Sequence, residues 1–156
     1  MTHKDTKFAP KIALYQPDIP QNTASIIRTC SCLGIMLEII EPCGFVFNER
    51  KFKRVVMDYY DAKGIHFYRS PEDFFISKRN TRIILMTTKS KKSYKEFEFK
   101  QNDTVLFGRE SSGVPVSVHK KASHRLTIPM VNKKRSLNLS SSVSIVLSKI
   151  LNQNNF

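Results

Sequence analysis

Glycine is scarce in this chain, and its spacing argues against two common nucleotide-binding motifs. The five glycines do not form the G-x-G-x-x-G fingerprint of dinucleotide-binding proteins. Gly108 and Gly113 have the spacing of a P-loop, but Val114 stands where that loop needs a lysine. The sequence also lacks a G-x-S-x-G nucleophile elbow and a carboxylate pair suited to hydrolysis. We therefore expect neither a dinucleotide or triphosphate site nor a hydrolase.

Cysteine and histidine are too few and too unfavourably spaced for a disulfide framework or a metal site. Cys30 and Cys32 fall in a predicted helix, where side chains two positions apart point in different directions. The four histidines lack metal-ligand spacing. We therefore expect no metal and a cytoplasmic location. No apolar run has transmembrane length and the first residues lack the apolar region of a signal peptide, so we expect no membrane association.

Acidic residues are half as numerous as basic ones, with 13 against 26, which gives a net charge of +13. A lysine-rich composition could explain this imbalance by itself, but a polyanionic partner, RNA or DNA, is the simplest interpretation. Such contacts fix affinity and position rather than sequence choice. The candidate RNA-binding residues lie in three clusters: Lys51, Lys53 and Arg54; Lys89, Lys91 and Lys92; and Lys133, Lys134 and Arg135.

Short apolar runs alternate with amphipathic segments along the chain, which predicts an α/β fold with a mainly parallel six-stranded sheet. After a flexible basic tail over residues 1–10, we expect one domain over residues 11–156. The predicted strands cover 11–15, 35–40, 65–68, 82–86, 104–107 and 124–128. The predicted helices cover 21–33, 48–57, a segment after Ser70, a short segment from Pro115, and a final helix whose apolar stripe runs from Leu139 to Leu151.

Three stretches are candidates for a ligand site because loops at the carboxyl ends of parallel strands bind ligands. The first helix presents Arg28 on its polar face, which is equally typical of a surface arginine. Residues 108–113 join a strand to a helix, and their glycines allow close approach of a ligand, although an ordinary turn has the same pattern. Residues 128–140 combine a basic loop with small polar residues that can cap the final helix.

Taken together, these stretches resemble the three motifs of the SPOUT RNA 2′-O-methyltransferases in order and spacing. The resemblance covers roughly Lys11 to Leu151, and the small size is similar to the TrmL (YibK) subgroup. It is carried by Pro20-Gln21-Asn22-Thr23 with Arg28, Gly108-x-Glu110 with Gly113, and Ile128-Pro129-Met130 with Ser136-Leu137-Asn138-Leu139-Ser140.

The resemblance implies a deep trefoil knot in the C-terminal half and a homodimer whose active site is completed across the interface. It implies S-adenosyl-L-methionine as cofactor, S-adenosyl-L-homocysteine as product and tRNA as substrate, with methylation of the wobble cytidine or modified uridine of leucine tRNAs. Carried over by motif position, the cofactor-binding residues are Met86, Gly108, Ile128 and Ser136, with Glu110, Met130 and Leu137 beside them.

The same resemblance assigns the handling of the ribose 2′-hydroxyl to Arg28. A guanidinium that stays charged is an awkward general base, so we expect Arg28 to anchor a phosphate and to stabilise the developing alkoxide. Asn138 is the second predicted catalytic residue, as a hydrogen-bond partner at the ribose. Departures from the family pattern at Arg109, Ser111, Ser112 and Ser148 leave open another tRNA or rRNA site. A non-catalytic RNA-binding protein of the same fold is a further alternative, against which the presence of Arg28, Glu110 and Asn138 argues.

Overall fold

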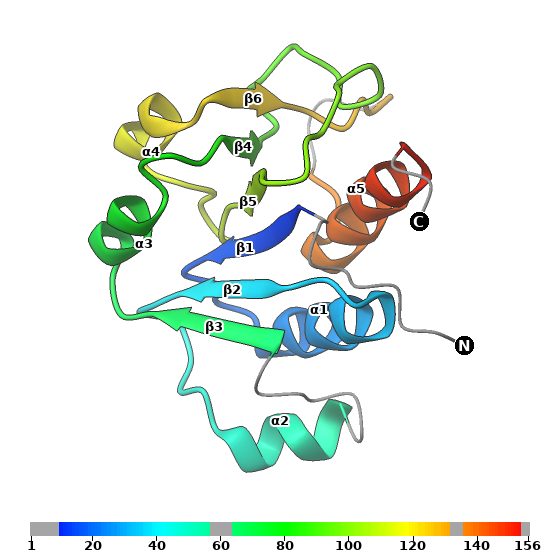
Figure 1. The fold of residues 1–156 in the computed structure, drawn as a ribbon. Coiled ribbons are helices and arrows are strands. Elements are labelled where there is room, and N and C mark those ends of the chain that lie inside the picture. The colour runs from blue at the N-terminus through cyan, green and yellow to red at the C-terminus, as the bar shows by residue number, and fades with distance from the viewer. Residues whose placement is uncertain (1–9, 57–63, 132–135, 154–156) are drawn as a thin grey trace.

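The computed structural model describes residues 10–56, 64–131 and 136–153 and contains a single parallel sheet with flanking helices (Figure 1). The strands are β1 (Lys11–Tyr15), β2 (Leu37–Ile40), β3 (Ile65–Tyr68), β4 (Ile83–Met86), β5 (Thr104–Phe107) and β6 (His124–Leu126). The helices are α1 (Pro20–Leu33), α2 (Glu49–Val56), α3 (Pro71–Ser77), α4 (Val116–Lys121) and α5 (Leu139–Gln153).

The six strands lie in the order β3-β2-β1-β5-β4-β6, and every pair is parallel. Strand order reverses between β1 and β5, because β2 and β3 extend the sheet on one side while β4 and β6 extend it on the other. Such a reversal places a crevice at the carboxyl ends of the two central strands. The predicted α/β class and parallel six-stranded sheet are thus confirmed.

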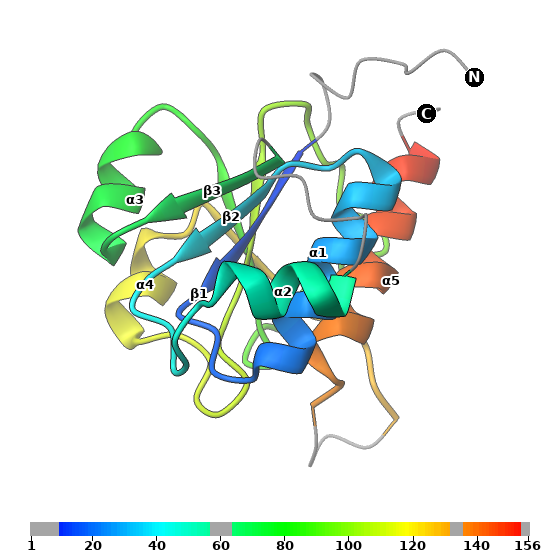
Figure 2. The same cartoon turned by 90° about the horizontal axis from the view of Figure 1, so that it is seen from below.

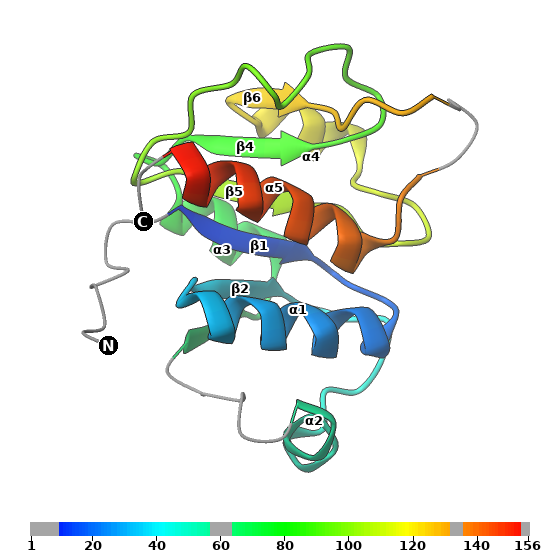
Figure 3. The ribbon, with the colours of Figure 1, turned by 90° about the vertical axis from the view of Figure 1, so that its right-hand side faces the viewer.

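Both faces of the sheet are covered, which explains why every residue of β2, β4 and β5 is buried, Glu38 of β2 included, and why β4 is apolar throughout. Helices α1 and α5 pack on one face, and α3 and α4 pack on the other (Figure 2). The core beneath α1 and α5 includes Ile26, Ile27, Val143, Val146 and Leu147, all 0–2% exposed. Figure 3 shows α1 and α5 side by side along the sheet.

The sequence patterns predicted most boundaries of helices and strands to within two residues of those in the structure. Ser70 caps α3 as predicted, because its hydroxyl accepts the Asp73 N–H at 3.1 Å. Strand β2 begins at Leu37, two residues later than predicted, and β6 ends at Leu126, two residues earlier. Leu33 is 39% exposed because α1 ends there and Gly34 turns the chain in a left-handed conformation.

Two further predictions concern the chain termini and membrane contact. Residues 1–9 of the predicted tail lie outside the described residues, and Pro10 is buried. Among the helices of the described residues, none has the length and apolar character needed to span a membrane.

Candidate active site

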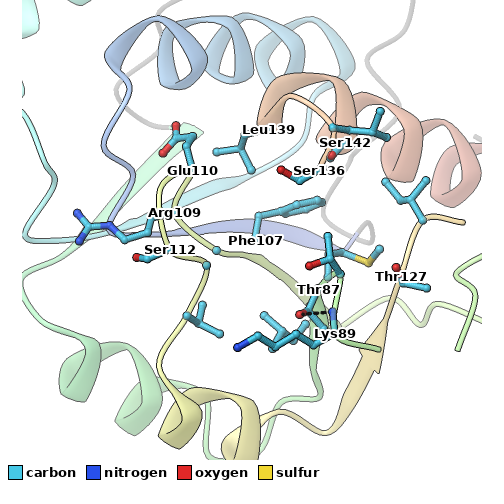
Figure 4. Close-up of a pocket in the computed structure, with 18 of the residues that line it drawn as sticks. Thr87, Lys89, Phe107, Arg109, Glu110, Ser112, Thr127, Ser136, Leu139 and Ser142 are labelled. Carbon is cyan, nitrogen blue, oxygen red and sulfur yellow. Dashed lines mark hydrogen bonds between the residues drawn. The ribbon is translucent and has the colours of Figure 1, made fainter. Parts of the chain in front are cut away.

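A cavity of about 440 Å³ opens at the carboxyl edge of the sheet, where the loops after β4, β5 and β6 meet the start of α5 (Figure 4). Its floor includes Met86 and Phe107, the last residues of β4 and β5. Thr87 and Lys89 come from the loop after β4, and Thr127 comes from the segment after β6. The volume lies within the range of small-molecule sites, about 300–1,000 Å³.

The cavity brings together residues that are far apart in the sequence. All seven predicted cofactor-binding residues line it: Met86, Gly108, Glu110, Ile128, Met130, Ser136 and Leu137. The predicted catalytic residue Asn138 lines it as well. Because the lining combines apolar side chains with loop backbone and small polar groups, it suits a ligand that has both a flat apolar part and a polar part.

The loop over residues 108–113 is closed tightly on itself. Arg109 and Gly113 exchange two backbone hydrogen bonds, of 3.1 Å from the Arg109 N–H and 2.9 Å from the Gly113 N–H. A Cβ at Gly108 would lie only 2.7 Å from the Gly113 Cα, and Gly113 has a φ of +67°. The turn therefore requires both glycines: Gly108 because a side chain there would collide with Gly113, and Gly113 because of its positive φ.

Glu110 joins this loop to the segment that follows β1. One carboxylate oxygen accepts the Asp18 N–H at 2.9 Å, and the other accepts the Asn22 side-chain N–H at 3.4 Å. Burial raises the pKa of Glu110, and the neighbouring Asp18 carboxyl raises it further. The hydrogen bond shared with Glu110 lowers the pKa of Asp18. The carboxylate of Glu110 thus ties the two central strand ends together at the point where strand order reverses.

Arg109 faces the same segment rather than the cavity centre, as Figure 4 shows. Its Nε donates to the Gln16 carbonyl at 3.0 Å and lies 3.8 Å from the Asp18 carboxylate. Gly44 packs against this junction, since a Cβ there would lie 2.5 Å from the Asp18 Cβ. Sequence reasoning did not assign Asp18 or Gly44 to the site, because neither carries a motif that signals long-range contact.

Asn138 is held at the start of α5 by two hydrogen bonds. Its Oδ1 accepts the Ser141 N–H at 3.2 Å, which caps the helix, and its Nδ2 donates to Asn22 Oδ1 at 2.9 Å. A second bond between the helices runs from the Ser140 hydroxyl to that of Ser25 at 2.8 Å. Asn22 also lines the cavity. It belongs to the first motif, but its role was not predicted.

The predicted catalytic Arg28 lies outside the lining of this cavity. It is exposed on α1, close to one helical turn beyond Ser25. The described structure therefore brings Asn138 together with the predicted cofactor-binding residues and leaves Arg28 on the adjoining helix surface.

The predicted RNA-binding residues that the structure describes fall into two groups at opposite edges of the sheet. Lys51 and Arg54 are exposed on α2, beyond β3 (Figure 1). Lys89, Lys91 and Lys92 follow β4, next to the other edge strand β6, and all three are exposed. The side chain of Lys53 and all of Lys133, Lys134 and Arg135 lie outside the described residues.

Comparison with known proteins agrees with this geometry. A family model described as the SpoU rRNA Methylase family matches residues 9–148. A protein of Beijerinckia indica named tRNA (cytidine(34)-2′-O)-methyltransferase is 42% identical over 91% of this chain and 90% of its own length. An Escherichia coli K12 protein of the same name is 35% identical over 87% of this chain and 88% of its own.

A solved structure concerned with 2-OH methylation of C/U34 on tRNA superposes with a TM-score of 0.88. It is 33% identical and covers 96% of this chain, which in turn covers 98% of that structure's chain. The resemblance noted in the sequence is therefore confirmed over nearly the whole chain, and the chain belongs to the SpoU rRNA methylase family.

Proposed function

We propose that this protein is a tRNA 2′-O-methyltransferase that acts on the wobble nucleotide, cytidine or uridine 34, with S-adenosyl-L-methionine as methyl donor. The observation that carries the proposal is the convergence of all seven motif-derived residues on one cavity at the carboxyl edge of the sheet. Relatives named tRNA (cytidine(34)-2′-O)-methyltransferase, 33–42% identical over most of the chain, support the reaction and the target position.

The residues of the cavity fit the proposed methyl donor. Met86, Ile128 and Leu137 offer apolar surface to an adenine ring, and loop N–H and C=O groups can bond its edge. Glu110 is the only carboxylate among the described lining residues, and both of its oxygens accept hydrogen bonds from the protein, one from the Asp18 N–H and one from the Asn22 side chain. Bound there, S-adenosyl-L-methionine would supply the reactive methyl group, while the protein orients the ribose and handles its proton.

Two residues of this chain act on the ribose in the proposal. Asn138, held by Asn22 and by the helix start, lies beside the cavity and can donate to a ribose oxygen. Arg28, exposed on α1, anchors a phosphate next to the target and stabilises the developing alkoxide in an active site completed by a second protomer. The homodimer and its shared site come from the family resemblance and remain part of the proposal.

Four further predictions belong to this proposal. The substrates are leucine tRNAs, the location is cytoplasmic, residues 11–156 form one domain, and the chain is knotted in its C-terminal half. Residues 132–135, which belong to that half, lie outside the described residues.

The test is methyl transfer to purified tRNA, followed by mass spectrometry of the digested nucleosides. Arg28→Ala is expected to abolish transfer while its affinity for S-adenosyl-L-homocysteine, measured by calorimetry, stays within severalfold of wild type. Equal loss of both would refute the role of Arg28. Methylation of a different tRNA or rRNA nucleotide would favour the second candidate, and ligand-independent RNA binding without transfer would favour a non-catalytic protein.

A further inference from the structure

Four hydrogen bonds form a continuous chain from the start of α5 to the loop after β5. The Ser141 N–H donates to Asn138 Oδ1 at 3.2 Å, and Asn138 Nδ2 donates to Asn22 Oδ1 at 2.9 Å. Asn22 Nδ2 then donates to Glu110 Oε1 at 3.4 Å, and the other oxygen of Glu110 accepts the Asp18 N–H at 2.9 Å. The chain links three segments that are distant in the sequence, residues 18–22, residue 110 and residues 138–141.

The direction of every bond in this chain is fixed by its two ends. The backbone N–H of Ser141 can only donate, and an ionised Glu110 can only accept. An asparagine amide has one accepting and one donating side, so each asparagine between these ends has a single satisfied orientation. Asn22 must present oxygen to Asn138, and Asn138 must present oxygen to the helix start. Reversing either amide would set donor against donor or acceptor against acceptor.

This polarity determines what the asparagines offer to a ligand. An amide nitrogen carries two hydrogens, and the chain uses one from each asparagine. Both Asn22 and Asn138 line the cavity, so its α1–α5 side presents hydrogen-bond donors. Donors suit a ribose 2′-oxygen that gains negative charge as it attacks, whereas a reversed amide would present an oxygen and repel it.

We propose that Asn22 and Glu110 are positioning residues that fix the amide of Asn138 so that its second N–H donates to the target ribose oxygen. The inference rests on the proposed function and adds the residues that impose the direction of that donor. Arg109 holds the segment that carries Asp18 and Asn22 in place, through its hydrogen bond to the Gln16 carbonyl and its ion pair with Asp18.

Single substitutions that reverse one link are expected to lower kcat at least about tenfold without changing the fold. Asn22→Asp keeps an acceptor for Asn138 but sets a second carboxylate against Glu110. Glu110→Gln keeps an acceptor for the Asp18 N–H but turns a donor toward the donor of Asn22. Asn138→Asp removes the proposed donor itself, and a loss of about a hundredfold in kcat is expected.

The decisive variant combines Asn22→Asp with Glu110→Gln. The new amide at position 110 can then donate to the new carboxylate at position 22, which still accepts from Asn138, so every link is satisfied again. We expect kcat to return to within about threefold of wild type, which is a strongly non-additive result. A double variant whose loss equals the product of the two single losses overturns the inference, as does an Asn138→Asp variant that retains wild-type kcat.

Controls separate this inference from folding and from the proposed function. Asn80→Asp and Glu96→Gln make the same charge changes at exposed positions outside the cavity lining and should leave kcat unchanged. Melting temperature and calorimetry with S-adenosyl-L-homocysteine are measured for all variants. If the wild-type protein neither binds this ligand nor methylates position 34, the proposed function fails. If it does both but the double variant is not rescued, only the inference fails.

Discussion

Gly108→Ala is expected to destabilise the loop after β5 and to abolish cofactor binding. The added Cβ would lie 2.7 Å from both the Cα and the carbonyl carbon of Gly113. Carbon atoms pack best about 3.5–4.0 Å apart, and the neighbour is backbone rather than a movable side chain. The loop must therefore open, which breaks the two hydrogen bonds between Arg109 and Gly113.

The magnitude follows from these two effects. Overpacking costs about 1–3 kcal/mol, and two lost hydrogen bonds cost about 1 kcal/mol each, so we expect a loss of about 3–5 kcal/mol in the free energy of unfolding. Gly113→Ala meets no atom within 4 Å but must adopt a φ of +67°, which costs about 1–2 kcal/mol. Gly64→Ala meets no atom within 4 Å and should stay within about 0.5 kcal/mol of wild type.

Urea unfolding of the three variants gives the free energies, and calorimetry with S-adenosyl-L-homocysteine gives the affinities. The expected order of destabilisation is Gly108→Ala, then Gly113→Ala, then Gly64→Ala. Refutation would be a Gly108→Ala protein that matches Gly64→Ala in stability and still binds the ligand. That result would mean that the loop adjusts without strain and that its tight closure does not shape the cavity.

Two further outcomes test the described structure away from the cavity. Lys78→Met should lower the free energy of unfolding in urea by about 3 kcal/mol, because the buried Glu38 carboxylate loses the ammonium 2.6 Å away and keeps only the more exposed Lys11 ammonium at 3.7 Å and the Tyr68 hydroxyl. A double variant that also replaces Glu38 with leucine should recover most of this loss, and its failure to do so would contradict the argument. When the native protein is alkylated at pH 8 and followed by peptide mass spectrometry, the exposed Cys32 should react first. Burial raises the pKa of Cys43 to about 11 and that of Cys30 to about 12, so both should react more slowly. Modification of Cys30 at the rate of Cys32 would contradict the burial of Cys30.

Local patterns in the sequence predicted the elements well because they depend on nearest neighbours. Apolar runs of four or five residues between turn residues indicated the strands, and Ser70 before Pro71 indicated the start of α3. The two-residue error at the start of β2 arose because the apolar run begins before the strand does. Boundaries such as this depend on packing, which a local pattern does not contain.

The candidate site was predicted in part. The motif resemblance identified seven of the residues that line the cavity, and also Asn138, which lines it as well. It gave Asn22 no role of its own, and it placed Glu110 beside the cofactor without indicating that its carboxylate accepts hydrogen bonds from Asp18 and Asn22. The three basic clusters were predicted from charge, which gave no indication that the described ones lie at opposite edges of the sheet.

By itself, the sequence determined the class of fold, the positive charge and the family motifs, because composition, periodicity and motif order can be read along the chain. Only the tertiary structure decided which side chains meet. The parallel sheet brings the ends of β1 and β5 together, so that Asp18 contacts Glu110 across 92 positions. Packing of α1 on α5 brings Asn22 to Asn138 across 116 positions. A hydrogen bond forms over about 3 Å, so the pairing of two groups depends on their distance in space, which spacing in the sequence does not reveal.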